Sequence, residues 1–186
     1  MKNHLIAGAK LTVLCAVLFG GVYTLFLLGI ARLAPNNGKG YVVEFNGKKY
    51  YQNIGQSFTD PKYFNSRPSA VAYNAAGSGG SNKGPGNPEY LAEVQKRIDT
   101  FLMLNPEVKK QDIPADLVTA SGSGLNPDIS AQAAKVQVKR IARIRNLEPQ
   151  KLEQLIAENT EKPLLGFFGP EKINVLTLNI ALDKLK

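Results

Sequence analysis

The feature that most constrains this chain is an uncharged apolar segment near its start. Residues 11–31, LTVLCAVLFGGVYTLFLLGIA, contain no charged side chain and lie between Lys10 and Arg32. As a helix this segment is about 31 Å long, which matches the bilayer core of about 30 Å. A helix also satisfies its own backbone hydrogen bonds, which lipid cannot do. We therefore predict a transmembrane helix over residues 11–32.

A cleaved signal peptide is the alternative explanation of this segment. The apolar core of a signal peptide is usually about 7–15 residues long and ends at a small-x-small cleavage site. Here the apolar run is longer, and the sequence from Ala31 to Ala34 is a poor cleavage site. An uncleaved anchor is therefore favoured. Within it, Gly20-Gly21 could let a neighbouring helix approach closely, or could have no partner.

The charges on either side of this segment predict its orientation. Residues 1–10 contain Lys2, Lys10 and the amino terminus but no acidic residue, which favours a cytoplasmic tail. Four basic residues follow the segment and favour the opposite arrangement: Arg32, Lys39, Lys48 and Lys49. A long following domain crosses the membrane largely regardless of charge, so the tail has more weight. We expect a single-pass protein of the cell inner (plasma) membrane, with a cytoplasmic N-terminus and an extracytoplasmic domain.

The rest of the sequence lacks the residues of the commonest catalytic and metal sites. The one cysteine, Cys15, lies in the apolar segment, and the one histidine, His4, lies in the leading tail. The following domain can therefore form neither a Ser-His-Asp triad nor a Cys/His zinc site. The net charge of +8 is not gathered into the dense basic patch typical of nucleic-acid binding. We expect no catalytic residue, no metal site and no nucleic-acid partner, which disfavours an unrelated envelope enzyme.

The sequence after the apolar segment predicts a linker and one soluble domain. Residues 33–40 form a short linker rich in Pro, Gly and Asn, and residues 41–186 form the domain. Asn46-Gly47 lies between two β-prone runs and predicts a hairpin, because both positions tolerate positive φ. Residues 56–88 are rich in Gly, Ser, Asn and Pro, which predicts a long irregular loop.

Caps and apolar spacing predict about three helices in this domain. Asn87 caps the first helix, which ends at Asn105 because a proline follows. Ser130 caps a second helix that continues to about Asn146. The third helix begins at Pro149, a residue type that suits the first helical position.

The C-terminal segment shows a different periodicity. Leu176, Leu178, Ile180 and Leu182 alternate with other residues, which predicts a strand with one buried face. Together the elements predict an α/β (α+β) fold class. In this fold one N-terminal transmembrane helix precedes a single soluble domain with a small mixed or antiparallel sheet and about three helices.

A basic face is predicted on the second helix. Lys135, Lys139 and Arg143 lie four residues apart, with Arg140 and Arg145 nearby. This face could dock an acidic partner, or it could be an ordinary solvated helix surface. The second explanation is favoured, because charged residues normally line exposed helix faces.

Two Gly/Ser-rich stretches resemble phosphate-binding loops only in part. Gly79 and Gly84 have the spacing of a P-loop, but Pro85-Gly86 stand where the motif needs Lys-Ser/Thr, and Lys83 precedes the second glycine. The SGSG at 121–124 is not the dinucleotide fingerprint either. Glycines in tight turns are the simpler explanation.

Polar residues around these stretches also have two explanations. Asp116 and Asp128 flank the second stretch, where turn capping explains them at least as well as paired-carboxylate chemistry. Arg67 and Tyr73-Asn74 could be recognition groups, or they could bond to carbonyls within the loop. The residues alone leave this open.

Four segments carry a family resemblance: GQSFTDPKYFNSRPSA, YNAAGSGGSNKGPGNP, PADLVTASGSGLNPDIS and INVLTLNIALD. In this order behind one N-terminal span, they resemble the C subunit of the Kdp potassium-transporting P-type ATPase over essentially the whole chain. YFNSRPSA, SGGSN-x-GP-x-NP and DLVTASGSGL-x-P-x-IS are together highly specific. The motif residues that become candidate contacts to a partner or a nucleotide are Arg67, Pro68, Ser69, Tyr73, Asn74, Ser78, Gly79, Gly80, Ser81, Asn82, Gly84, Pro85, Asn87, Pro88, Asp116, Ser121, Gly122, Ser123, Gly124 and Pro127.

The resemblance implies a role in high-affinity, ATP-driven potassium import. It implies three protein partners, in addition to the lipid bilayer: a potassium-channel-like subunit, an ATP-hydrolysing P-type subunit and a small single-span subunit. The implied role is a non-catalytic accessory subunit that stabilises the complex and acts as a catalytic chaperone, raising the ATP affinity of the hydrolysing subunit. The family is often labelled ATP-binding, so ATP is expected through the complex, with no firmly bound cofactor. The alternative is an extracytoplasmic cap over the ion entrance, without nucleotide contact.

The chain departs from the family pattern at a few positions. Lys83 stands where the family usually has an apolar residue. ENTEKPLLGFFG resembles the family's HT-x-GR-x-LG-x-LG, but Asn159 replaces the histidine and Lys162-Pro163 replace Gly-Arg. Any role of that histidine therefore does not transfer to this chain.

Overall fold

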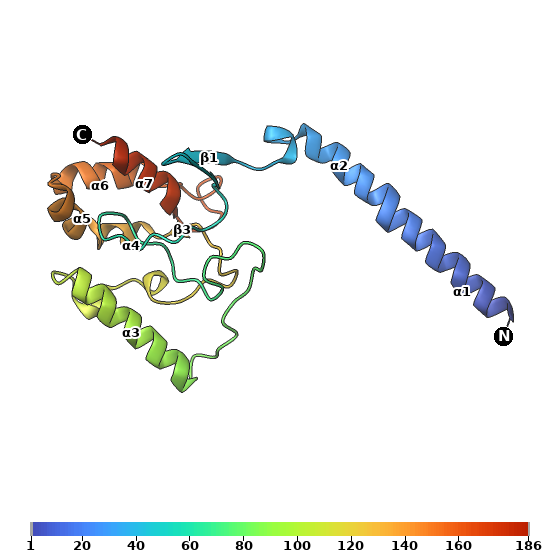
Figure 1. The fold of residues 1–186 in the computed structure, drawn as a ribbon, viewed down its shortest axis with the longest axis horizontal. Helices are drawn as coiled ribbons and strands as arrows, with labels where there is room; N and C mark the ends of the chain where they lie inside the picture. The colour runs from blue at the N-terminus through green and yellow to red at the C-terminus, as the bar shows by residue number, and fades with distance from the viewer. Residues whose placement is uncertain (1, 186) are drawn as a thin grey trace. The chain divides into compact units, whose positions relative to one another are not determined.

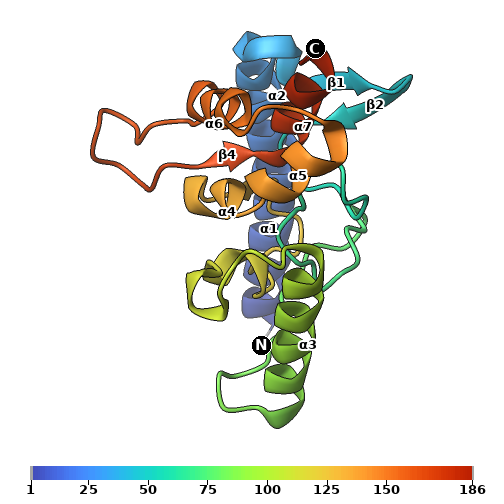
Figure 2. The same cartoon turned by 90° about the vertical axis from the view of Figure 1, so that its left-hand side faces the viewer.

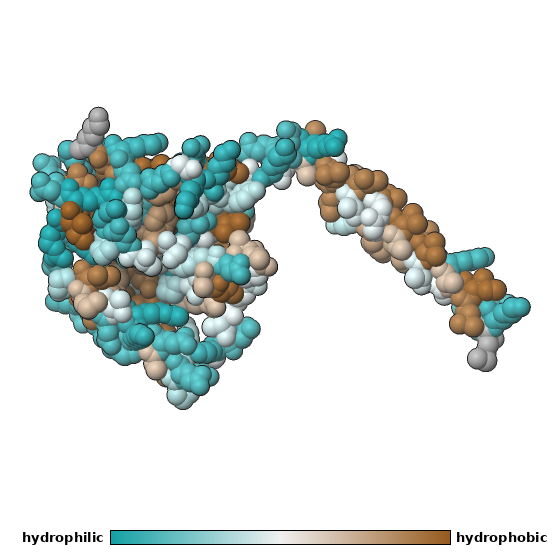
Figure 3. Space-filling model, in the orientation of Figure 1, coloured by the Kyte–Doolittle hydropathy of each residue, from teal (hydrophilic) through white to brown (hydrophobic). Residues whose placement is uncertain are grey.

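A computed structural model describes residues 2–185, and it divides them into two compact units that meet between Val42 and Val43. The first unit contains one long helix, Lys2–Leu33, which includes the predicted span and also the residues before it. It is long and apolar enough to cross a membrane, and hydrophobic side chains line it (Figure 3).

The long helix has three consecutive parts. They are α1, Lys2–Cys15; the π-helical segment η1, Ala16–Tyr23; and α2, Thr24–Leu33 (Figure 1). In the wider π turn, the hydroxyl of Thr24 donates to the carbonyl of Phe19 at 3.1 Å, five residues back. The helix ends at Ala34, which is extended because Pro35 follows it, and the 3₁₀ turn η2, Pro35–Gly38, comes next.

The predicted hairpin is confirmed. Strands β1, Val42–Phe45, and β2, Lys48–Tyr51, pair in a two-stranded sheet. Asn46 and Gly47 form the turn between them, with φ of 51° and 73°. The segment that follows contains no helix or strand among its described residues until Pro88, which agrees with the predicted irregular loop.

The predicted helix caps are also confirmed. Helix α3, Pro88–Leu104, begins after Asn87, whose side chain accepts from the backbone N–H of Tyr90, and it ends at Asn105. Short 3₁₀ turns follow: η3, Lys110–Asp112, and η4, Ala115–Leu117.

The second predicted helix is interrupted. Ser130 caps α4, Ala131–Lys135, and the chain then turns before α5, Val138–Arg145. Asn146 ends α5 in the left-handed conformation with φ of 52°. The third helix, α6, Pro149–Glu158, starts where it was predicted.

The predicted C-terminal strand is wrong over most of its length. Only β4, Ile173–Asn174, is extended, and α7, Val175–Lys184, follows it. The side chain of Asn174 accepts from the backbone N–H of Thr177, so it caps the helix. Val175, Leu178 and Leu182 lie at helical spacing and are buried, so the same apolar residues satisfy a helix as well as a strand.

The core lies between the helices α4 to α7 and a sheet of two short strands. Strand β3, Asp128–Ile129, pairs antiparallel with β4, and α6 packs against α4, α5 and α7 (Figures 1 and 2). Fully buried side chains fill the space between them: Ile141, Leu152, Ile173, Leu178 and Leu182. The predicted fold class is confirmed as helices with small antiparallel sheets behind a long apolar helix.

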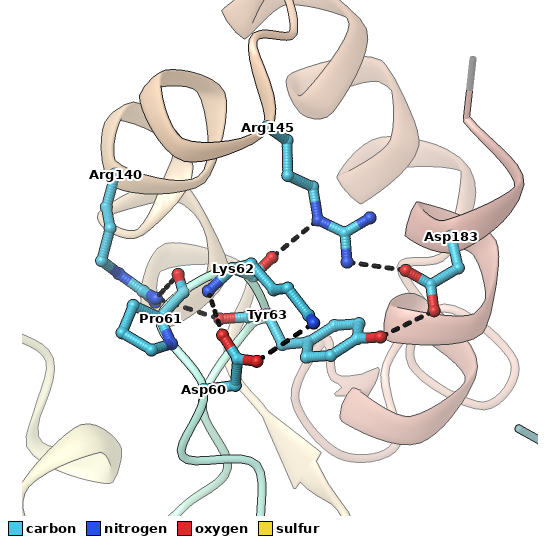
Figure 4. A network of polar contacts seen from close by, with 7 residues as sticks. All are labelled: Asp60, Pro61, Lys62, Tyr63, Arg140, Arg145 and Asp183. Atoms are coloured by element: carbon cyan, nitrogen blue, oxygen red, sulfur yellow. Dashed lines mark hydrogen bonds and ion pairs between the residues drawn. The ribbon is translucent and has the colours of Figure 1, made fainter.

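One buried cation, Arg140 of α5, organises the segment that leads into the motif loops. Its side chain is 1% exposed. Its guanidinium donates to the carbonyls of Pro61 and Tyr63 (Figure 4). It also donates to the side-chain oxygens of Asn65, Asn105 and Gln137. Within residues 2–185 no carboxylate forms an ion pair with it. Burial lowers the pKa of Arg140 to about 10, so it stays charged at neutral pH.

A second set of polar contacts joins Lys62 and Tyr63 of the same segment to α5 and α7. Arg145 donates to the carbonyl of Lys62 at 2.8 Å and pairs with Asp183 at 2.6 Å. The hydroxyl of Tyr63 donates to the same carboxylate at 2.8 Å (Figure 4). Arg140 and Arg145 therefore do not belong to the predicted basic face, because their side chains form hydrogen bonds within the domain.

Replacing the buried cation should destabilise the fold strongly. Arg140→Met should lower the free energy of unfolding by roughly 3–5 kcal/mol, because several buried oxygens lose their donor. Urea unfolding of the full chain in detergent micelles measures this change. Lys139→Met, on the exposed face of the same helix, is the matched control and should stay within about 0.5 kcal/mol of the parent. Equal losses for the two variants would contradict the organising role of Arg140.

Candidate functional site

The two motif stretches, distant in sequence, form one surface. We call residues 65–87 the first motif loop and residues 116–127 the second. The backbone N–H of Gly79 and the hydroxyl of Ser78 both donate to the carbonyl of Ser123, at 2.9 and 3.0 Å. The backbone N–H of Ser121 donates to the carbonyl of Pro68 at 3.3 Å. The loops are therefore joined by hydrogen bonds at two places.

Two glycines of these loops, Gly80 and Gly124, lie where the two backbones approach closely. A Cβ at Gly124 would lie 2.7 Å from the carbonyl oxygen of Gly79 and 2.7 Å from Val71, and Gly124 also has φ of +67°. A Cβ at Gly80 would lie 3.1 Å from the carbonyl oxygen of Gly122. Packing between the loops accounts for these glycines without a phosphate ligand.

Tyr73 and Ser69 fix the shape of the first motif loop. The hydroxyl of Ser69 accepts from the backbone N–H groups of Val71 and Tyr73, at 3.2 and 2.9 Å. The Tyr73 hydroxyl donates to the carbonyl of Arg67 at 2.7 Å, and burial raises the pKa of Tyr73, so the phenol keeps its proton. Arg67 itself donates to the carbonyl of Thr119 in the second loop at 3.3 Å. These predicted recognition groups therefore bond within the loops.

Other predicted residues fasten the ends of the loops to the helices. Asn87 caps α3, as described above. Asp116 accepts from the backbone N–H and the hydroxyl of Ser130, at 2.7 and 3.3 Å, which supports the residue that caps α4. The carbonyl of Pro127 accepts from the backbone N–H of Val175 at the start of α7. Asp116 thus makes a contact to Ser130, fourteen residues along the chain, and not a local turn cap.

The side chain of Lys83 contacts α3. Its ammonium contacts Glu93 at 2.6 Å and Glu89 at 3.7 Å, and the hydrogen bond with Glu93 raises the pKa of Lys83. The neighbouring Asn82 is left-handed with φ of 53°, and the carbonyl of Gly84 accepts from Asn87. The lysine is thus an anchor between the first motif loop and α3.

A groove of about 360 Å³ opens beside the first motif loop, and sequence analysis did not predict it. Its floor is apolar, with Phe58, Phe101 and Leu117, and Tyr73 and Lys96 line it as well. These residues come from separate segments that only the tertiary fold brings together, so no local pattern could have identified them. Among residues 2–185, no group of three or more His, Cys, Asp or Glu side chains is placed to hold a metal ion.

Comparisons with known proteins agree along the whole chain. A family model described as K+-transporting ATPase, c chain (KdpC) matches residues 5–184. A potassium-transporting ATPase KdpC subunit from Flavobacterium johnsoniae is 56% identical over 187 residues, covering 100% of both chains. KdpC subunits from Bacteroides fragilis strain YCH46 and Bacillus cereus strain Q1 are 51% and 45% identical. The alignments cover 98% and 95% of this chain, and 97% and 93% of those relatives.

The pairing of the two loops should be sensitive to one methyl group. Gly124→Ala should lower the free energy of unfolding by about 2–4 kcal/mol, because a left-handed residue gains a Cβ that contacts the opposite loop. Faster hydrogen exchange at the N–H of Gly79, whose acceptor is Ser123, should accompany it. Gly84→Ala is the matched control, since no heavy atom lies within 4 Å of its added Cβ. Similar stability of both variants would show that the loops are not tightly paired.

Proposed function

Since the chain belongs to the KdpC family of K+-transporting ATPase c chains, we propose that it is a membrane-anchored accessory subunit without catalytic chemistry of its own. Its helix Lys2–Leu33 would anchor it in the bilayer. The relatives named potassium-transporting ATPase subunits support a place in that complex. The proposed partners are a potassium-channel-like subunit, an ATP-hydrolysing P-type subunit and a small single-span subunit.

The observation that carries this proposal is that the motif loops bond to each other. The N–H groups of Gly79 and Ser121 donate to the opposite loop, and Lys83 pairs with Glu93. A phosphate cradle needs its N–H groups and its lysine directed at the ligand. The paired loops therefore favour a fixed surface that another protein recognises over a nucleotide site.

We propose that this subunit stabilises the assembled complex and raises the ATP affinity of the hydrolysing subunit indirectly. The basic leading tail supports a cytoplasmic N-terminus, which leaves the domain extracytoplasmic, as a cap over the ion entrance of the channel-like subunit. A domain on that side cannot contact cytosolic ATP, so its influence must pass through packed helices of the partners. In this proposal ATP is a ligand of the complex and not a cofactor of this chain.

Cysteine labelling tests the orientation directly, because the only native cysteine, Cys15, can be replaced by alanine. In that background, Ala76→Cys lies on the exposed part of the first motif loop. It should react with a membrane-impermeant maleimide in intact spheroplasts. Asn3→Cys, in the leading tail, is the matched control and should react only after permeabilisation. The reverse pattern would place the domain in the cytoplasm and reopen direct ATP contact.

Omission of the chain tests the accessory role. When the other subunits are expressed without it, potassium-stimulated ATP hydrolysis in isolated membranes should fall to background, because the complex lacks a stabilising part. Restoring the full chain should restore both assembly and activity, which phosphate release and co-purification measure. Normal assembly and normal turnover without the chain would contradict the proposed function.

A further inference from the structure

A well-formed arm projects from the domain between α6 and β4, at residues 160–172 (Figure 2). Two antiparallel bridges close it, Glu161 with Lys172 and Leu164 with Phe168. The N–H of Glu161 donates to the carbonyl of Lys172 at 2.8 Å, and the N–H groups of Leu164 and Phe168 each donate to the other residue's carbonyl, at 3.0 and 2.9 Å. These bonds give the arm a defined shape.

The tip of this arm is apolar and exposed. We define the arm tip as Leu164, Leu165, Phe167 and Phe168, which are 71, 75, 70 and 57% exposed. The two phenylalanine rings lie 4.2 Å apart between centroids and form one patch. Gly166, between Leu165 and Phe167, turns the chain with φ of 83°. Contiguous exposed apolar side chains on an ordered element mark an interaction site.

The residues at the base of the arm indicate which kind of partner fits the tip. Glu161, Lys162, Glu171 and Lys172 balance to zero net charge, and Lys172 is already paired with Asp128 and Glu161. Segments that lie in a membrane surface combine an apolar face with surplus Lys and Arg on the polar face. The arm has an apolar tip but no surplus charge. An apolar centre with a charge-balanced polar rim has the make-up of a protein–protein interface.

A second copy of the chain is a poorer occupant. The groove beside Phe58 and Phe101 is the apolar recess that an arm from another copy could enter. Such a contact would join two different surfaces, so a closed assembly requires a reciprocal exchange of arms or a ring of copies. A recess on a different protein needs no such closure and is the better match.

We propose that the arm tip is a docking anchor that inserts into an apolar recess on another subunit of the potassium-transporting complex. The recess lies on the side of the membrane where the domain lies. This inference rests on the proposed accessory function and adds the contact surface that carries it. The exposed phenylalanines are its main anchors, because aromatic side chains dominate interface energetics.

The test uses the tagged full chain co-expressed with the other subunits. Phe167→Ser/Phe168→Ser should reduce the recovery of partner subunits by at least about tenfold, as expected for loss of buried interface anchors. Met103→Ser is the matched control, because Met103 is 74% exposed on α3, outside the arm. It should recover the partners like the parent chain. Thermal unfolding of both variants should match the parent.

A photo-cross-linking residue at Leu165, in an otherwise unchanged chain, gives a second readout that does not depend on a destabilising substitution. Its adduct should contain another subunit of the complex. Adducts only with lipid, adducts only with a second copy, or no adduct would overturn the inference, as would full recovery by the phenylalanine variant. If the parent and Met103→Ser chains also recover no partner, the proposed function itself fails, so the two failures are distinguishable.

Discussion

A buried guanidinium without a carboxylate partner among the described residues is the constraint on which the domain depends. The guanidinium of Arg140 donates to carbonyl and amide oxygens. These hydrogen bonds offset the free-energy cost of removing the guanidinium from water only if every acceptor oxygen stays in place. Asn179 of α7 complements it, since its amide bonds both the N–H and the carbonyl of Phe64, at 2.9 and 3.0 Å. Two helices thus fix residues 60–65, and the first motif loop starts from a rigid base.

The chemistry of the motif loops follows from that rigid base. Ser121 and Gly124 are buried, and the backbone N–H groups of Gly79 and Ser121 donate to the opposite loop. Within residues 2–185, no buried side-chain nitrogen or oxygen lacks a hydrogen-bond partner. The buried side-chain groups therefore have their hydrogen-bond partners within the chain. What the loops present to another molecule is their outer surface, held in one shape.

The sequence predicted correctly the turns and helix caps that depend only on residues close together in the chain. The turn at Asn46-Gly47 and the cap at Asn87 depend on neighbouring residues, and both formed as predicted. The C-terminal alternation failed because buried Leu178 and Leu182 fit a helix equally well, and the cap of the preceding asparagine decided between them. Arg140 looked like a surface charge, because its acceptors at Pro61 and Asn65 are distant in sequence. The sequence also did not predict the pairing of the two motif loops, because the bonded residues are distant in sequence.

The arm and the second motif loop are joined through the paired strands β3 and β4. Asp128 follows the second motif loop and pairs with Asn174 of β4, and its carboxylate contacts Lys172 at the base of the arm at 3.0 Å. Ile173 beside that lysine is fully buried in the core. The core cluster includes none of the apolar residues at the arm tip, and an exposed apolar patch of this kind is typical of an interaction site. Because β3 and β4 set the arm and the second loop on one scaffold, a partner that engages either surface meets the other at a fixed geometry.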